Sequence, residues 1–439
     1  MTRTVPLLCA LLAAAASPPP APAQQRPIAF TGARIIPITS APIENGVLVV
    51  QGGKIAAVGA AGRVNVPADA EVHDVTGMVI MPGLVDTHSH IGGGDGGDRS
   101  APMHGDVRIL DAIDARDDGI QKAQAGGITT ANVMPGSGLL MSGQTAYLKL
   151  RDGRTIYDLL YCDDVLTDIC GGMKMANGTN PRGNPPAPGT RAKAAAIVRA
   201  KFIKAQEYRE KIRAADGDPE KMPPRDLELE ALVQVLEGKR TVHFHTHRHD
   251  DILTALRLAE EFGFRIVLHH VSEAWKVVDE IAASGAPASI ILLDSPGGKL
   301  EAMDISNANG AALEKAGVLV AFHTDDGITD SRLFLRSAGF AVRYGMSRDA
   351  ALYALTMAGA RILGLEDRIG SLERGKDADF IILSGDPLSV YTHVLQTWVE
   401  GEKVFDLADP RDYIYAVGGR SAGIVTATTT NYHEGMEGH

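Results

Sequence analysis

The sequence predicts an α/β protein in which a (β/α)8 TIM barrel carries a small β-sandwich formed by both chain ends. Three observations predict this. Short β-like runs occur at both ends of the chain, and apolar strands alternate with amphipathic helices between them. The length of 439 residues also accommodates a barrel of about 250 residues with an accessory domain. A doubly wound parallel sheet is the alternative, because strand count alone does not exclude it.

Residues 1–23 are predicted to be a signal peptide. Arg3 precedes an apolar run from Val5 to Ala16, and Ala21-Pro22-Ala23 fits the small-x-small cleavage rule. The run is too short to span a bilayer. We expect cleavage near Ala23 and a periplasmic or secreted mature chain. A disordered Ala- and Pro-rich cytosolic tail is the alternative.

The mature chain keeps two of the three cysteines. Cys162 and Cys170 could form a disulfide in an oxidising compartment, and two buried free thiols are the alternative. Cys9 lies within the apolar run after Leu8, which is not the small residue expected before a lipid-anchored cysteine.

The composition is that of an ordinary globular protein, with 45% hydrophobic and 22% charged residues. The net charge of -11 argues against nucleic acid or an anionic membrane surface as a partner. The charge itself supports no inference about the substrate. A small-molecule substrate and no membrane anchor are expected on other grounds. A homo-oligomer is left open.

Residues 24–79 and 377–409 contain the short β-like runs, with hairpin turns such as Asn45-Gly46 between them. A strand cannot bury its apolar face alone, so we expect the two segments to join in one sandwich. Residues 80–376 form the predicted barrel. The chain is poorly periodic from Leu139 to Pro188, where the third and fourth strands are expected. Residues 410–439 are expected to be a surface tail.

The segment Met81 to His90 (MPGLVDTHSH) is the central motif. His88 and His90 are two apart at the end of an apolar strand, so both rings point to one face. In a barrel that face opens at the C-terminal end, where active sites lie. Two convergent imidazoles suit Zn2+, Ni2+ or Fe2+ better than Ca2+ or Mg2+.

The motif resembles the first-strand metal motif of the amidohydrolase superfamily. From about Ile28 to Leu407 the chain resembles the imidazolonepropionase-related branch, including the segment Leu365 to Leu383 (LEDRIGSLERGKDADFIIL). The resemblance implies a metal-dependent hydrolase with Zn2+ or another divalent transition metal, one or two per chain. Imidazolone ring opening itself is disfavoured, because His247-Arg248 stands where those relatives have acidic residues and the chain is expected to be exported.

The resemblance assigns His245 as the fifth-strand metal ligand, with His247 above it facing substrate. His243 is expected deeper in the strand, as a hydrogen-bonded core imidazole. His249 is expected either behind the direct metal ligands or facing solvent. On the sixth strand, one of the adjacent residues His269 and His270 is expected to face inward, because neighbours on a strand point oppositely, and the resemblance favours His270. In relatives with two metals it binds the second, and in relatives with one it contacts substrate.

On the eighth strand, Asp325 aligns with the carboxylate that binds the metal and accepts a proton from the attacking water. Asp326 is expected to point away as a cap, and His323 to lie below Asp325 as its partner. Lys174 matches a fourth-strand lysine that is carboxylated to bridge two metals in some relatives. A substrate-anchoring or exposed lysine is the alternative, and Arg182 in the loop that follows could bind a carboxylate.

The predicted mechanism uses His88, His90, His245 and Asp325 to hold a metal that activates water for attack on a carbonyl carbon. His270 or His247 assists, and Asp325 passes the proton to the leaving nitrogen. Two other classes stay open. One is a deaminase of the same fold, which substrate profiling would separate, and the other is a non-catalytic metal-binding barrel.

Overall fold

The structure is a computed structural model that describes residues 26–94, 96–183, 188–292 and 300–418. The expected signal peptide, its cleavage near Ala23 and residues 419–439 of the expected tail lie outside the described residues. Within the described ranges, no helix is both long enough and apolar enough to cross a membrane. A disulfide joins Cys162 and Cys170, as one of the two alternatives proposed.

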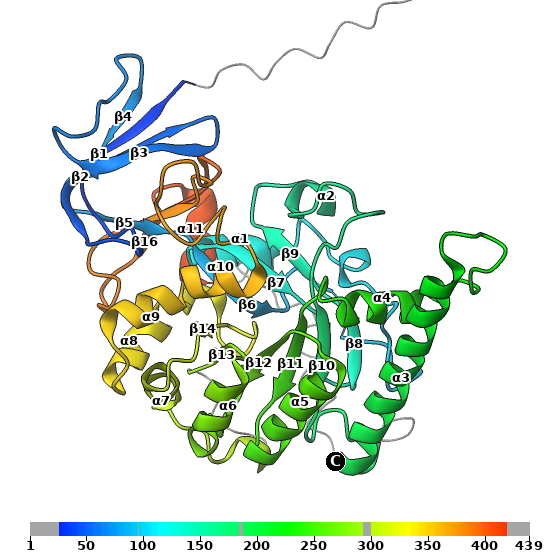
Figure 1. Cartoon of the computed structure of the whole chain (residues 1–439). Helices are drawn as coiled ribbons and strands as arrows, with labels where there is room; N and C mark the ends of the chain where they lie inside the picture. The colour runs from blue at the N-terminus through cyan, green and yellow to red at the C-terminus, as the bar shows by residue number, and fades with distance from the viewer. Residues whose placement is uncertain (1–25, 95, 184–187, 293–299, 419–439) are drawn as a thin grey trace, which may run out of the picture.

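Both chain ends contribute to one mixed sheet of eight strands, here called the chain-end sheet (Figure 1). Its order is β17-β16-β15-β5-β1-β2-β3, with β4 paired to β1. The antiparallel pair β5–β15 joins the N-terminal strands to the C-terminal ones. A second sandwich layer stays a prediction. The strands are β1 (Ile28–Ile35), β2 (Ile43–Gln51), β3 (Lys54–Ala60), β4 (Glu71–Asp74), β5 (Val79–Pro82), β15 (Phe380–Leu383), β16 (Val394–Val399) and β17 (Glu402–Asp406).

An aromatic cluster packs the two chain ends against each other. The ring centroid of Phe30 lies 5.0 Å from that of Phe380 and 5.1 Å from that of Trp398. Phe30 and Phe380 are fully buried. Because aromatic side chains bury large apolar areas, this contact stabilises the joint sheet beyond its backbone hydrogen bonds.

The middle of the chain forms two further sheets. One has the order β14-β13-β12-β11-β10-β8 and the other β6-β7-β9. Figure 1 shows β10 to β14 side by side, with α5 and α6 packed along them. The strands are β6 (Leu84–Ser89), β7 (Ile128–Val133), β8 (Met141–Gln144), β9 (Ala146–Lys149), β10 (Met173–Ala176), β11 (Val242–Thr246), β12 (Ile266–His270), β13 (Ala288–Ile290) and β14 (Val320–Phe322).

The helices lie between these strands in the chain, as the alternating pattern predicts. They are α1 (Asp118–Ala125), α2 (Ile156–Leu159), α3 (Arg191–Ala215), α4 (Leu227–Leu236), α5 (His249–Phe262), α6 (Val278–Ser284), α7 (Asn309–Lys315), α8 (Arg336–Arg343), α9 (Arg348–Ala354), α10 (Met357–Leu363) and α11 (Pro410–Val417).

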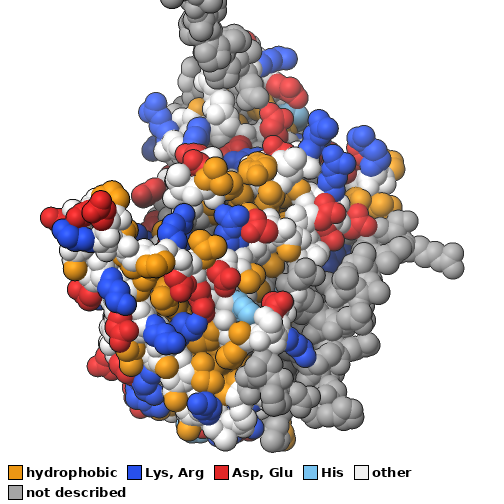
Figure 2. All heavy atoms as spheres, turned by 90° about the vertical axis from the view of Figure 1, so that its right-hand side faces the viewer, with side chains coloured by type: hydrophobic (Ala, Val, Ile, Leu, Met, Phe, Trp, Pro, Cys, Tyr) orange, Lys and Arg blue, Asp and Glu red, His pale blue; other side chains and the backbone are white. Residues whose placement is uncertain are grey.

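On the face shown in Figure 2, Lys and Arg side chains are intermixed with Asp and Glu.

The expected parallel alternation fails between residues 139 and 188. There β8 pairs antiparallel with β10, and β9 pairs antiparallel with β7. Only Thr145 separates β8 from β9. A parallel connection needs a dozen or more residues, so these two strands cannot be consecutive strands of a β–helix–β unit.

The three-stranded sheet meets the six-stranded sheet at two places. Thr145 links β8 to β9, and beyond β14 the backbone N–H of Asp325 donates to the carbonyl of His88 on β6, over 2.9 Å. Seven of the strands run in parallel pairs β6–β7 and β10 to β14, so their C-terminal ends can face one space. Closure into a (β/α)8 barrel stays a prediction.

Specific contacts set three element boundaries. The apolar run that leads to His88 is divided between β5 and β6 at Gly83, where a Cβ would lie 2.2 Å from the side chain of Thr129. The chain-end sheet extends to Pro82. Helix α5 begins at His249, where the Glu273 carboxylate accepts the His249 N–H.

The third boundary lies at the expected tail, because α11 forms where an irregular chain was expected. Asp409 caps this helix by accepting from the backbone N–H of Arg411, and Pro410 occupies the first turn. Proline is favoured at that position because its fixed φ suits a helix and its missing N–H is not needed there. The cap and the proline are visible in the sequence as helix-start signals.

A buried lysine connects the chain-end sheet to the rest of the molecule. Lys149 at the end of β9 is fully buried and forms ion pairs with Asp377, with Asp379 at 3.0 Å and with Glu400 at 3.1 Å. Burial alone would lower the pKa of Lys149, but the three carboxylates raise it above its ordinary value. The lysine is therefore charged and compensated by residues from the C-terminal segment.

We predict that Lys149→Met lowers the free energy of unfolding by about 3–5 kcal/mol, because it leaves buried carboxylates without their cation. Lys221→Met is the matched control, since the Lys221 side chain is 70% exposed and its pair with Asp218 is worth less than about 1 kcal/mol. Urea unfolding of both variants checks this. Equal midpoints for the two variants would contradict the prediction.

Candidate metal centre

The predicted ligands lie at the ends of strands from the two sheets that the middle of the chain forms, here called the inner sheets. His88 is on β6 and His90 follows it, while Asp325 follows β14. Asp325 Oδ1 lies 2.9 Å from His90 Nε2 and 3.3 Å from His88 Nε2. The three residues offer ligand atoms within 4.8 Å of one another, and we call them the mouth group.

Lys174 on β10 reaches the mouth group from the other side. Its Nζ lies 3.0 Å from His88 Nε2 and 3.0 Å from Met134 Sδ, and the side chain is fully buried. An ammonium is costly to bury. Burial excludes an exposed edge lysine, and both the bridging and the substrate-anchoring roles of Lys174 stay predictions.

His245, His247 and His270 form a second set of ligand atoms within 4.8 Å of one another, here called the β11–β12 group. All three are buried. His245 therefore shares a set of ligand atoms with His247 and His270, and its role beside His88, His90 and Asp325 stays a prediction. His270 connects the two groups, because its Nε2 is 3.9 Å from Asp325 Oδ2.

The expectation that only one of His269 and His270 points inward rested on strand alternation, which is wrong at this point. His270 has a φ of 68° and Val271 a φ of 42°, so β12 ends in a left-handed turn. Both rings consequently approach His88, with centroids 5.0 Å and 5.1 Å from it. No turn residue such as glycine stands at this point of the chain to signal the turn.

The other histidines are placed as follows. His243 is fully buried and bonded to Tyr147 Oη and to His269 Nε2, each at 3.0 Å, which fits the expected core imidazole. His249 contacts Glu273 at 2.6 Å, with its side chain 43% exposed. His323 bonds to Ser289 Oγ at 2.7 Å, and no contact with Asp325 is among its hydrogen bonds.

Asp326 points away from the group, as expected for a cap. Its carboxylate accepts from Lys122 Nζ at 3.0 Å and from the backbone N–H of Ser331 at 3.3 Å. Asp326 therefore fixes the segment after β14 and leaves Asp325 as the carboxylate that faces the histidines.

Burial favours the neutral form of two of the imidazoles. It is the largest cause that holds the pKa values of His88 and His270 well below the ordinary value, with Lys174 adding to the effect at both. Burial alone would raise the pKa of Asp325, but the hydrogen bond from His90, with the charges of His90 and His323, holds it well below its usual range.

The residues fit a divalent transition metal. Neutral imidazoles and one carboxylate are the ligands that Zn2+ and its neighbours prefer. His270 Nε2 is buried and has no hydrogen-bond partner among the described residues, as a nitrogen reserved for an ion would be. His90 Nδ1 donates to the carbonyl of Met134 at 2.8 Å, which orients its Nε2 toward the group.

Known proteins support this assignment. Residues 212–405 match the model described as the amidohydrolase family. An amidohydrolase from Thermotoga maritima MSB8 has 36% sequence identity and a TM-score of 0.80, over 86% of this chain and 100% of that one. The chain belongs to the amidohydrolase family. The class expected from the sequence, a hydrolytic enzyme acting on carbon–nitrogen bonds, is thereby confirmed.

Two curated relatives are similar over most of this amidohydrolase. The amidohydrolase tasK of Hapsidospora irregularis is 28% identical over 376 residues, or 78% of this chain, and the chain spans 38% of that protein. An imidazolonepropionase of Deinococcus radiodurans is 29% identical over 375 residues, covering 78% of this chain and 86% of that one.

Asp86 is a residue of the site that the sequence reasoning missed. It is fully buried on β6, and its carboxylate accepts from the backbone N–H groups of His88 and Thr324 and from Thr324 Oγ1. It therefore ties the ligand on β6 to the segment that carries Asp325. The signal was present, because Asp86 stands two residues before His88 and shares its face of the strand.

We predict that Thr324→Val lowers metal affinity about 10- to 100-fold, because the loss of a hydroxyl behind a ligand has that effect in other metal sites. Competition with a chromophoric chelator measures it. Thr397→Val is the control. Thr397 on β16 is also buried, and its Oγ1 donates to the backbone carbonyl of Gln124, outside the mouth group. The expectation fails where both variants bind metal as tightly as the parent enzyme.

Proposed function

We propose that this amidohydrolase is a metal-dependent enzyme that cleaves a C–N amide bond in a small molecule, such as a peptide, N-acyl or cyclic amide. The observation that carries the proposal is the mouth group, in which His88, His90 and Asp325 converge from β6 and the segment after β14. Two imidazoles and a carboxylate with an adjacent buried lysine suit hydrolysis better than simple metal storage.

The proposal includes a (β/α)8 barrel formed by the two inner sheets. The hydrogen bond from Asp325 to His88 and the short link at Thr145 support it, since they join the sheets at both edges. In such a barrel the C-terminal strand ends form the active-site face. His88, Lys174, His245 and His270 all lie at or near those ends.

His88, His90 and Asp325 would hold one divalent ion such as Zn2+, and His245, His247 and His270 would hold a second ion or contact the substrate. A bound ion supplies Lewis acidity, which polarises a carbonyl and activates water. Asp325 accepts the proton that water loses as its oxygen adds to the carbonyl carbon. The same carboxyl then returns the proton to the nitrogen as the C–N bond breaks.

The loop after β10 supplies groups beside the centre. Asn180 Nδ2 donates to His245 Nε2 at 3.2 Å. Arg182, two residues on, has a buried Nε with no hydrogen-bond partner among the described residues. A guanidinium with an unused donor at such a site suits a substrate that carries a carboxylate, as dipeptides and N-acyl amino acids do.

We predict that Asp325→Asn lowers kcat about 10²- to 10⁴-fold while the enzyme stays folded, because an amide cannot accept the proton. Asp330→Asn is the control on the same segment, where Asp330 pairs with Arg332 outside the mouth group. A screen of dipeptides, N-acyl amino acids and cyclic amides identifies the substrate for the assay. Full activity in Asp325→Asn would refute the proposed mechanism.

We predict that Arg182→Met raises KM about tenfold or more for a substrate with a free carboxylate, since hydrogen bonds to charged groups contribute about 1.5–3 kcal/mol. The corresponding substrate amide, which lacks the charge, is the matched control and should show little change. An equal rise in KM for acid and amide would assign Arg182 to loop structure instead.

A further inference from the structure

We infer that His88, His269 and His323 form a further transition-metal site, buried beneath the mouth group and sharing His88 with it. The three residues offer ligand atoms within 4.8 Å of one another. Neither His269 nor His323 is needed by the proposed hydrolysis. The inference rests on the proposed function only in that His88 belongs to both sites.

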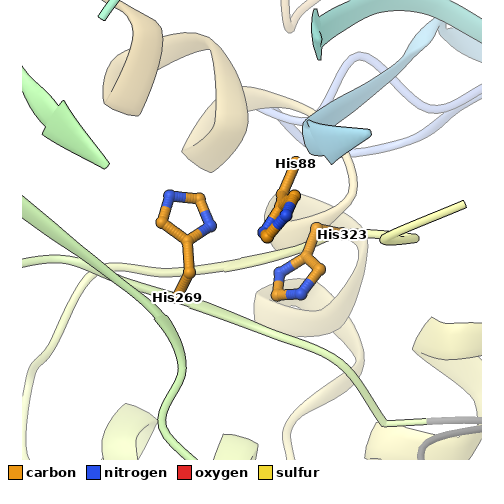
Figure 3. Close-up of side chains that lie close together, drawn as sticks. All are labelled: His88, His269 and His323. Carbon is orange, nitrogen blue, oxygen red and sulfur yellow. The ribbon is translucent and has the colours of Figure 1, made fainter. Parts of the chain in front are cut away.

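The three rings come from different strands and face a common space. His88 is on β6, His269 is on β12, and His323 directly follows β14. Figure 3 shows them grouped together. The ring centroid of His88 is 5.0 Å from that of His269 and 4.9 Å from that of His323, and the last two are 5.6 Å apart.

In His269 and in His323, one ring nitrogen is hydrogen-bonded to a neighbouring side chain and the other is available to an ion. His269 Nε2 bonds to His243, while its buried Nδ1 has no hydrogen-bond partner among the described residues. His323 Nδ1 bonds to Ser289 Oγ, and its Nε2 has only a long 3.4 Å contact with His270. Histidines that bind metals show this pattern, with one nitrogen held and the other on the ion.

His88 can serve both groups as an imidazolate, because each of its two ring nitrogens carries a lone pair once the ring proton is lost to solvent as the ions bind. Its Nε2 faces His90, Lys174 and Asp325 in the mouth group. Its Nδ1 is buried and has no hydrogen-bond partner within the described part of the chain. Buried polar atoms are nearly always paired, so two such nitrogens in one cluster call for an explanation such as an ion.

A further layer of side chains holds the outer ligands in place. His243 bonds to Tyr147 Oη at 3.0 Å, and Ser289 bonds to Thr87 Oγ1 at 2.6 Å. His88, His269 and His323 are at most 1% exposed. A fixed, dry cluster of rings is preorganised, so an ion would not have to order it.

The chemistry of the cluster selects the kind of ion. Three imidazole nitrogen donors suit Zn2+, Co2+, Ni2+ or Cu2+, whereas Ca2+ and Mg2+ require oxygen. The Asp325 carboxylate lies 3.3 Å from His88 Nε2 and would offset part of the charge of the ion.

Crystals of the unaltered full-length chain, grown with excess Zn2+, test the site directly. Anomalous difference maps at the zinc edge should show a peak about 2.0–2.1 Å from nitrogens of His269 and His323. This peak should be separate from one at the mouth group. A filled mouth group with no peak between His269 and His323 would overturn the inference, whatever the substrate screen shows.

Metal content provides an independent readout. His269→Phe and His323→Phe should each bind one Zn2+ fewer per chain than the parent, while His249→Asn, which alters a half-exposed ring, should bind the full number. Asp325→Asn separates the two sites, because it should weaken the mouth group and leave the buried ion. Parental zinc content in folded His269→Phe and His323→Phe would also overturn the inference. Should these variants not fold, the anomalous map of the unaltered chain decides.

Discussion

The Asp86 carboxylate sits where the two inner sheets meet, and the candidate centre depends on it. By accepting from His88 and from Thr324 it fixes β6 relative to the segment beyond β14. The backbone hydrogen bond from Asp325 to His88 joins the same two segments. The imidazole of His88 and the carboxylate of Asp325 are thereby held at hydrogen-bond distance. No local structure could do this, because the two segments are far apart in sequence.

Much of the fold was predictable because its signals are local. Apolar runs such as Val242 to Thr246 and the cap at Asp409 depend on neighbours in sequence. The middle region was not predictable, since β8 and β9 are short and antiparallel. Which strand they pair with is decided by distant residues on β7 and β10.

The site was predictable in its residue types and less so in its grouping. His88, His90 and Asp325 follow from a motif and a resemblance, and the structure brings them together. His245 groups with His247 and His270, and His269 approaches His88 instead of pointing away from it. Their positions depend on where β12 ends, and the positive φ of His270 breaks the alternation on which the reasoning relied. Backbone turns at non-glycine residues leave little trace in a sequence.

The pairing of β5 with β15 has a consequence for how the protein is made. The edge of β5 that receives β15 is open until nearly the whole chain has been synthesised. An unpaired strand edge is a template for association with other chains. Nascent or stalled chains should therefore be the aggregation-prone species, and slow long-range pairing of this kind favours assistance by a chaperone.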